Sequence, residues 1–312
     1  MHSPKIKPTL LSQKPLTLNS DWLQQVIEPH LSLEYYDSDK TYHKGSTVFY
    51  APYDAPVTDI QQQFVDNGFK IVYDNLWERP VTDPVTDCSK YILQHQNWFR
   101  YYESLWYTHL GYDTYQPQQS YKHLALMPMR LKKTHRDLAV QKLQPWLHDF
   151  IWSYVAQGRQ LPNGGDALND GNAQRLFNSD WYNDTCFSFV VEGTISIARG
   201  VFITEKTYKP LAYYHPFVIL APPGILASLQ NQGFETFENL FDESYDSEPD
   251  WQKRLDCLVS NVKQFQKQPY DRLTQEKINH NHELFFDSAL VTDHILKDLI
   301  YPLLNWASYE TI

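Results

Sequence analysis

The residue types best suited to chemistry gather in the segment FSFVVEGTISIARGVFITEKTYKP. Glu192 follows its strand-like beginning, and Thr204 stands before Glu205, Lys206 and Thr207. Because threonine is a common N-cap residue, Thr204 predicts a helix that starts at Glu205. The start of a helix offers unpaired N–H groups and partial positive charge, which favour anions. Lys206 adds a point charge suited to a diphosphate.

Two carboxylates flank this predicted strand-to-helix turn. An acid in the first turn of a helix often does no more than compensate the helix dipole. Glu192 at the strand end and Glu205 at the helix start together favour a second interpretation. They would bind the hydroxyl groups of a ribose or sugar while Lys206 holds phosphate. Pro210 limits the regularity of this helix.

A second candidate cluster is the basic run MRLKKTHR, which contains Arg130 and Arg136. It is the most basic point in a chain of net charge −10, with 27 Lys and Arg against 37 Asp and Glu. The two arginines are candidates for diphosphate contacts, and the alternative is a solvated helix start. An acidic chain repels nucleic-acid backbones, so a large duplex footprint is disfavoured.

Sequence motifs for several other site types are absent. The sequence has no GxxxxGK[ST], GxGxxG, GxSxG or HExxH motif. His280 and His282 alternate near a predicted helix, where surface or capping roles are the more common interpretation. Asp37 and Asp39 have the DxD spacing of some metal-dependent sugar transferases, but this short pattern is common by chance. We therefore expect neither a metal nor a cofactor.

The elements that position these residues predict an α/β fold. Strands are expected at 46–50 and 69–73, with a helix at 57–67 ended by Gly68, which gives a parallel βαβ unit. Ligands of such sheets bind at the carboxyl ends of the strands. A third strand at 123–127 precedes a long helix expected from about Asp137 to Tyr154, kinked at Pro145.

The second half of the sequence repeats this pattern. We expect strands at 187–191 and 217–220 and helices at 204–214, 223–230 and 251–265, with a last helix from about Asp287. Gly158, Gly164, Gly165 and Gly171 mark a candidate boundary near residue 155. The expected domains are an α/β lobe at 1–155 and a second α/β lobe at 156–312, whose final helix packs back. The fold class is α/β, with two Rossmann-like lobes and a cleft between them.

Composition places the chain among folded proteins. Its 312 residues are 42% hydrophobic and 21% charged, which excludes a disordered tail, a coiled coil and a collagen-like fibre. The 22 Tyr and 9 Trp can stack sugars or bases, or fill cores. The three cysteines, Cys88, Cys186 and Cys257, form no paired spacing, and no signal or membrane segment is visible. We therefore expect a cytoplasmic location.

The segment from Phe187 to Asp246 resembles the donor-binding segment of α1,3-fucosyltransferases, in which SFEN precedes TEK[LI][YW]; here SFVVEG and TEKTYKP stand in those places. Exostosin-like glycosyltransferases share a related pattern. With HPFVIL, GFETF and DESYD, the segment looks closer still to a group of phage and bacterial glycosyltransferase-like proteins. The first 90 residues carry no resemblance. The two valines, Val190 and Val191, depart from the SFEN spacing and leave fucose and GDP open as donor groups.

The resemblance implies a GT-B type transferase that uses a nucleotide sugar as substrate. It implies that the lobe at 156–312 binds the nucleotide sugar and that the lobe at 1–155 is the acceptor side. It implies that Glu192, Glu205 and Lys206 contact the nucleotide, with Thr204 and Thr207 at the same helix start, and that an arginine of the linking region contacts the diphosphate. Arg130 and Arg136 are its candidates, and their basic neighbours are Lys132, Lys133 and His135.

Transfer with inversion needs a general base to deprotonate the acceptor hydroxyl. We expect it from the first half, where Asp54, Asp74, Glu78 and Glu103 are the acidic candidates. Asp74 is favoured because it follows the FKIVY strand directly, and Glu78 lies in the loop beyond it. Each has a plain surface role as its alternative. Glu243, in the loop DESYD, either holds acceptor hydroxyls or belongs to a solvated turn.

The sequence thus predicts a glycosyltransferase that moves a sugar from a nucleotide-diphosphate donor to a carbohydrate or other hydroxyl acceptor. One alternative is a phage enzyme that glycosylates modified DNA bases, so a nucleic acid stays open as acceptor. Another is a catalytically silent protein that binds carbohydrate or nucleotide, or a virion protein of the same fold. The donor sugar, the nucleotide base and the stereochemical outcome are left open.

Overall fold

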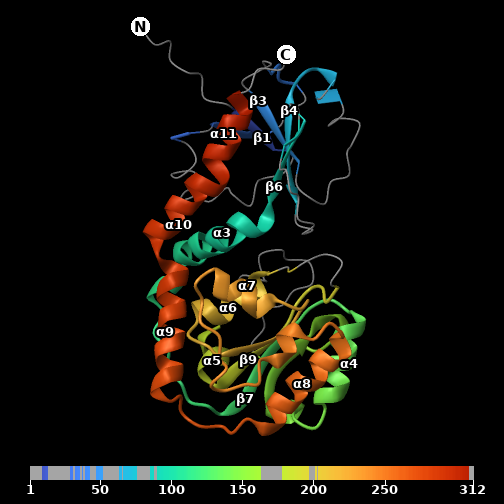
Figure 1. Ribbon diagram of the computed structural model, residues 1–312, viewed down its shortest axis with the longest axis vertical. Coiled ribbons are helices and arrows are strands. Elements are labelled where there is room, and N and C mark those ends of the chain that lie inside the picture. The colour runs from blue at the N-terminus through green and yellow to red at the C-terminus, as the bar shows by residue number, and fades with distance from the viewer. Residues whose placement is uncertain are drawn as a thin grey trace. The chain divides into compact units, whose positions relative to one another are not determined.

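Two separate sheets, each with helices beside it, organise the chain (Figure 1). The chain divides into two compact units, Met1–His109 with Ser288–Ile312, and Leu110–Asp287. The strands within each sheet are mostly parallel, which confirms the predicted α/β class. The computed structural model describes residues 9–12, 29–30, 32–35, 37, 39–42, 47–51, 63–64, 66–75, 85–87, 90–162, 178–196, 201 and 203–308.

The sheet of the first unit has the strand order β2-β1-β3-β4-β6-β5. Neighbouring strands are parallel except for the antiparallel pair β5–β6. The strands are β1 (Thr9–Ser12), β2 (Ser32–Tyr35), β3 (Thr47–Ala51), β4 (Lys70–Asn75), β5 (Val85–Asp87) and β6 (Lys90–Gln94). The strands expected at 46–50 and 69–73 are β3 and β4. Most of the helix expected at 57–67 lies outside the described residues, but Gly68 has the positive φ of 79° expected of its cap.

The helices of the first unit come from both ends of the chain. They are α3 (His95–His109), α10 (Ser288–His294), the π-helical segment η7 (Ile295–Ile300) and α11 (Tyr301–Ser308). Tyr101 of α3 stacks on His294 of α10, with 4.9 Å between ring centroids. The buried Lys70 Nζ of β4 donates to the Trp306 carbonyl of α11 at 2.8 Å. These contacts attach the C-terminal helices to the first unit.

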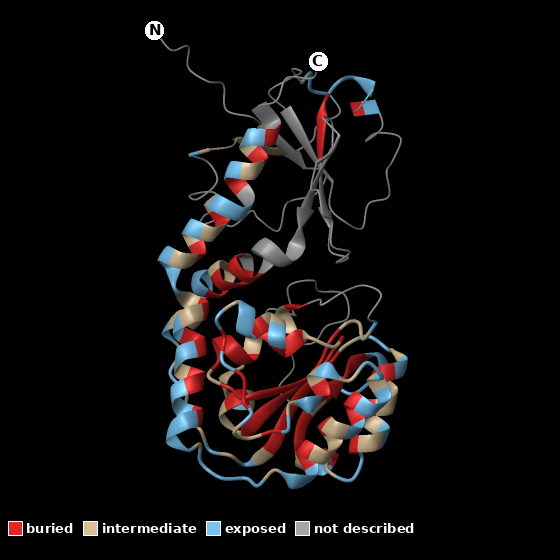
Figure 2. Ribbon diagram, viewed as in Figure 1, coloured by how far each residue is buried: buried red, intermediate tan, exposed pale blue. Residues whose placement is uncertain are grey.

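The second unit is built on a four-stranded, wholly parallel sheet of order β10-β9-β7-β8. Its strands are β7 (His123–Met129), β8 (Phe150–Tyr154), β9 (Thr185–Val191) and β10 (Phe217–Leu220). Every residue of β9 and β10 is buried, and Figure 2 shows these strands at the centre of the unit. Continuous burial explains why both strands are mainly apolar and show no alternation of apolar and polar residues, with Thr185 and Ser188 of β9 as the polar exceptions.

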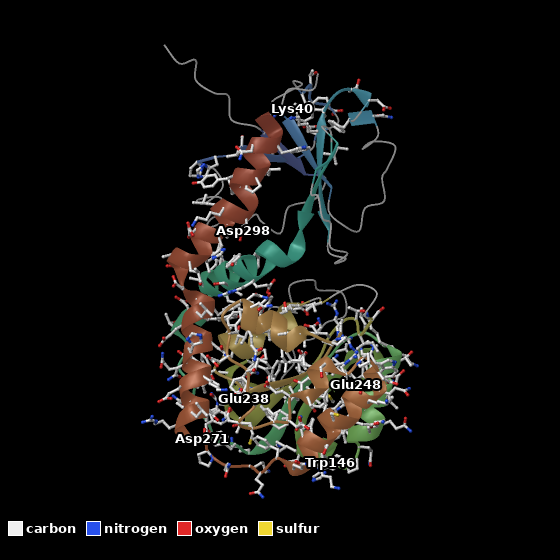
Figure 3. All side chains as sticks on the ribbon, in the orientation of Figure 1. Lys40, Trp146, Glu238, Glu248, Asp271 and Asp298 are labelled. Atoms are coloured by element: carbon white, nitrogen blue, oxygen red, sulfur yellow. The ribbon has the colours of Figure 1, made fainter. Side chains whose placement is uncertain are left out.

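Helices cover this sheet on both faces. They are α4 (Thr134–Leu143), α5 (Ser179–Asn183), α6 (Glu205–Ala212), α7 (Ile225–Asn231), α8 (Trp251–Gln264) and α9 (Arg272–Phe286). The crossovers from β7 to β8 and from β9 to β10 run in opposite directions along the sheet. Because such crossovers are right-handed, α4 and α6 lie on opposite faces. Asp271, labelled in Figure 3, caps α9 by accepting a hydrogen bond from Thr274 N at 2.8 Å.

The prediction of a long helix from about Asp137 to Tyr154 is wrong. The helix α4 ends at Leu143, before Pro145, and the run Phe150–Tyr154 is strand β8, paired in parallel with β7. Proline cannot continue the ladder of helical hydrogen bonds, and the run FIWSY has the aromatic and β-branched content of a buried strand. Its apolar residues match the helical period only because a short apolar run fits both the helical and the strand period.

The expected domain boundary near residue 155 differs from the division of the structure. Residue 155 lies within the second unit, directly after β8, and β7 and β8 belong to the same sheet as β9 and β10. A boundary at 155 would divide that sheet between its two central strands. The glycines Gly164, Gly165 and Gly171, on which the expectation depended, lie outside the described residues.

None of the helices in the described ranges has the length and apolar character needed to cross a membrane.

Candidate functional site

The second unit contains a pocket of about 350 Å³ at the carboxyl ends of β7 and β9. These adjacent strands form the switch point of the sheet, because the chain leaves β7 toward β8 on one side and returns to β9 on the other. Ligands of open parallel sheets bind at this position. The pocket is lined by Leu126, Pro128, Met129, Arg130, Leu131, Lys133, Arg136, Tyr182, Ser188, Val190, Val191, Gly193, Glu205, Lys206, Lys209 and Pro210.

Glu192, at the end of β9, is completely buried, and its carboxylate is bonded within the protein. Oε1 accepts from Thr204 N at 3.1 Å and from Thr207 Oγ1 at 2.7 Å. Oε2 accepts from Thr204 Oγ1 at 2.7 Å and from Gly193 N at 3.2 Å. The sequence predicts that this carboxylate binds a sugar or ribose. Its hydrogen bonds instead connect the start of α6 to the end of β9.

Thr204 caps α6, as its sequence position predicts. Its Oγ1 accepts from Lys206 N at 3.3 Å, and its carbonyl accepts from Thr207 N at 3.0 Å and Tyr208 N at 3.3 Å. The first N–H groups of the helix are therefore largely engaged within the protein. An anion at this helix start would be bound mainly by side chains, contrary to our expectation of free backbone N–H groups.

Glu205 and Lys206 form an ion pair on the pocket wall, with 2.5 Å between Oε1 and Nζ. Burial raises the pKa of Glu205, but the charge of Lys206 outweighs burial and the pKa falls to about 2. Burial likewise opposes the charged form of Lys206, yet the Glu205 and Glu192 carboxylates hold its pKa above the ordinary value. Both groups are thus ionised at neutral pH, so Lys206 retains the positive charge expected of it.

Arg136, from the first half of α4, is 2% exposed and makes hydrogen bonds only to backbone carbonyls among the described residues. Nη1 donates to Leu131 O at 2.9 Å and Nη2 to Val191 O at 3.4 Å. Nε makes no hydrogen bond within the described part of the chain. Burial lowers the pKa of Arg136, and the nearby Glu192 charge opposes this effect. A guanidinium held in this way favours an anionic ligand.

The neighbouring basic residues join the ends of β7 and β9. Lys133 Nζ donates to the Gly193 carbonyl. The buried His135 makes a 3.0 Å hydrogen bond from Nε2 to the Glu192 carbonyl, and burial lowers its pKa to about 4. His135 is thus neutral at pH 7 and positions the backbone, whereas Lys133 contributes charge to the pocket wall.

Positive charge dominates the pocket. Five cationic side chains line it, and Glu205 is the one carboxylate among its described lining residues: the cations are Arg130, Lys133, Arg136, Lys206 and Lys209. Such a concentration of positive charge in a chain of net charge −10 would suit a multiply charged anion. The structure therefore brings both predicted basic segments, MRLKKTHR and TEK, to one pocket.

The remaining predicted site residues lie elsewhere or are not placed. Glu243 accepts from Thr236 Oγ1 at 2.9 Å and from Phe237 N at 2.6 Å, and it does not line the pocket. Asp74 is in β4, opposite Leu93 of β6, and Glu78 lies outside the described residues. Thr204 and Thr207 serve the Glu192 network and are not among the pocket-lining residues.

Sequence reasoning missed three lining residues with polar side chains: Lys209, Ser188 and Tyr182. Lys209 follows Glu205 by one helical turn, so the helical period could have placed it on the same face. Ser188 and Tyr182 gave no sequence signal, because one lies within an apolar strand and the other belongs to a tyrosine-rich chain.

The candidate metal residues have other partners. His280 Nε2 bonds to Gly233 O and His282 Nδ1 to Ala212 O, each at 2.8 Å. In the DxD pattern, Asp37 Oδ1 accepts from Asp39 N at 2.9 Å. Among the described residues no group of three His, Cys, Asp or Glu side chains could hold a metal ion.

The chain is similar in structure to α1,3-fucosyltransferase. One such crystal structure is matched over 100% of this chain and 93% of the other, with 8% sequence identity and a TM-score of 0.49. A second, of α1,3-fucosyltransferase with GDP-fucose, is matched over 100% and 94%, with 10% identity and a TM-score of 0.48. No protein-family model matches the sequence, and no curated protein matches it.

Proposed function

We propose that this protein is a glycosyltransferase that binds a nucleotide-diphosphate sugar in the pocket between β7, β9 and α6. The observation that supports the proposal is the convergence of five cationic side chains on a pocket at the switch point of a parallel sheet. A diphosphate is a multiply charged anion whose oxygens suit arginine and lysine donors.

The same charges would promote the reaction. Cleavage of the bond between the sugar and the diphosphate leaves negative charge on the leaving oxygen, and fixed cations stabilise that charge in the transition state. Arg136 is best suited to this role, because it is held by backbone carbonyls and keeps an Nε–H available within the described structure. Lys206, held by Glu205, and Arg130 would bind the remaining phosphate oxygens.

The identity of the general base is a further part of the proposal. Asp74, at the end of β4, is the favoured residue and Glu78 the second. A base that acts only on the acceptor hydroxyl contributes to turnover and little to donor binding. Asp74→Asn is therefore expected to lower kcat while the Kd for the nucleoside diphosphate stays unchanged. A cytoplasmic location is also kept as a proposal, because the spacing of the three cysteines gives no disulfide framework.

Ligand-induced stabilisation tests the donor site. The wild type, Lys206→Ala and the exposed control Lys253→Ala would be heated with and without UDP, GDP, ADP, CDP, UDP-glucose and GDP-fucose. A ligand that binds only the native state at 100 times its Kd adds about 2.7 kcal/mol of stability. We expect one nucleotide to raise the Tm of the wild type and the control, and to raise that of Lys206→Ala much less.

Two other outcomes would decide against the proposal. If no nucleotide stabilises the folded wild type, the pocket is not a donor site and a binding or structural role takes precedence. If a nucleoside diphosphate binds but no sugar is transferred to any acceptor and no donor is hydrolysed, the protein is a nucleotide-binding protein without transferase activity.

A further inference from the structure

Beyond the cationic residues, the pocket continues between α6 and the face of the sheet. Leu126 and Pro128 of β7, Val190 of β9 and Pro210 of α6 give this inner part apolar walls. Ser188 lies among them, paired with Leu126 across the two strands and 3% exposed. It lies three residues before the end of β9, or about 10 Å deeper along the strand than Val191. A ligand held at the cationic end can thus extend inward to Ser188.

The Ser188 hydroxyl is bonded to a buried histidine whose tautomer is fixed. His215 Nε2 lies 3.0 Å from the Thr185 carbonyl, which can only accept, so Nε2 carries the hydrogen. His215 is 1% exposed, and burial lowers its pKa to about 4, so the ring is neutral at pH 7. A neutral imidazole has one N–H group, and Nδ1 is therefore an acceptor.

This tautomer fixes the direction of the next hydrogen bond. Ser188 Oγ lies 2.8 Å from His215 Nδ1, so the serine hydroxyl donates its only hydrogen to the imidazole. Its oxygen lone pairs remain, and no other hydrogen bond to Oγ occurs among the described residues. Ser188 thus presents an acceptor, and no donor, to the inner pocket.

On the basis of the proposed function, we infer that the inner pocket holds the nucleobase of the donor and that Ser188 Oγ accepts a hydrogen bond from a base N–H group. His215 acts as a positioning residue, because it sets the polarity of the serine without facing the ligand.

The chemistry of the inner walls favours a base over a sugar. Burying a hydroxyl without a hydrogen-bond partner costs free energy, and a sugar would bring several hydroxyls against Leu126, Val190 and Pro210. A nucleobase buries flat apolar faces and concentrates its polar atoms at its edge. A single acceptor at the end of an apolar pocket matches that edge.

Isothermal titration with four nucleoside diphosphates, the nucleotide sugar of the preferred base and inorganic pyrophosphate tests the inference. The proteins would be the wild type, Ser188→Ala and Lys206→Ala. Loss of one neutral hydrogen bond should weaken binding of the preferred nucleoside diphosphate about fivefold to tenfold in Ser188→Ala. Pyrophosphate, which has no base, should bind Ser188→Ala as it binds the wild type. Lys206→Ala should weaken both ligands.

A change in the ligand provides a second measurement that leaves the protein intact. Methylation of the base N–H group, as in 3-methyl-UDP or 1-methyl-GDP, removes the donor and adds bulk. The wild type should lose at least fivefold more affinity for the methylated ligand than Ser188→Ala does, because the variant lacks the acceptor and has more room.

Each contrary outcome has its own meaning. Equal losses for pyrophosphate and the nucleoside diphosphate in Ser188→Ala, or no loss for either, would overturn the role of Ser188 and leave the donor site standing. A loss confined to the nucleotide sugar would place the sugar in the inner pocket and overturn the base assignment. If the wild type binds no nucleoside diphosphate, the proposed function fails as well.

Discussion

At the residue scale, three of the described histidines, His135, His215 and His282, are buried, and the first two are bonded to groups at the pocket. Burial lowers the pKa of both His135 and His215 to about 4, and each is held by a backbone carbonyl. Both are therefore neutral at pH 7, where their fixed hydrogen bonds position the pocket. A histidine that must stay neutral in the native state makes folding sensitive to mild acid.

The predicted consequence is a loss of stability between pH 7 and pH 5. Below its ordinary pKa of about 6.5 a histidine binds a proton in the unfolded chain but not in the native state, so the free energy of unfolding falls with pH toward 4. A pKa lowered from about 6.5 to about 4 reduces the free energy of unfolding by about 2 kcal/mol per histidine between pH 7 and pH 5. Urea unfolding at pH 7, 6 and 5 measures it.

Two variants test whether His215 contributes to this pH dependence of stability. His215→Asn should show a shallower pH dependence of the unfolding free energy than the wild type. His280→Asn is the control, because His280 is exposed. A pH dependence that is the same in all three proteins would contradict the assignment.

At the element scale, the start of α6 depends on one buried carboxylate. Glu192 accepts hydrogen bonds from two backbone N–H groups and two threonine hydroxyls, and thereby joins β9 to α6. The pocket wall that carries Lys206 and Lys209 is part of the same helix. The position of these cations thus follows from a residue that does not line the pocket.

Glu192→Gln is predicted to destabilise the protein by about 3 kcal/mol, because a buried network that loses a partner costs that order of free energy. In either orientation, the amide NH2 group would face a backbone N–H group, of Thr204 or of Gly193. Denaturant unfolding provides the measurement. The exposed Glu283→Gln should change stability by less than about 0.5 kcal/mol, and an equal effect of the two substitutions would refute the prediction.

At the scale of the whole molecule, the pocket belongs to one unit. All its lining residues come from the continuous stretch 110–287, which also contains the whole four-stranded sheet. The first unit, in contrast, combines residues from both ends of the chain.

The fragment Leu110–Asp287 is predicted to fold cooperatively and to bind the preferred nucleoside diphosphate within about tenfold of the affinity of the full chain, since it keeps its own core and the complete pocket. The fragment 156–312 lacks β7, β8 and the run MRLKKTHR, so it should not fold. Thermal unfolding by circular dichroism and isothermal titration test both statements. A folded 156–312 fragment beside an unfolded 110–287 fragment would support the boundary near residue 155 instead.

Much of the fold could be predicted because the signals are local. The strands at 187–191 and 217–220 are apolar runs with defined ends, and Thr204, Gly68 and Gly233 mark helix ends through capping and positive φ. Strand β8 could not be distinguished from a helix, because a short apolar run of five residues fits both periods. The decision depended on its pairing with β7, a contact that sequence patterns do not contain.

The candidate site, too, could be predicted from the sequence only in part. By itself the sequence determined where positive charge is concentrated and which threonine starts α6, because residue type and local capping settle both. Only the tertiary structure decided what each group faces. It turned Glu192 inward and kept Glu243 away from the pocket. It also brought Ser188 of β9 together with His215, which lies between α6 and β10. The direction of a side chain is set by packing against residues far away in the chain, and a single sequence does not encode those contacts in any local pattern.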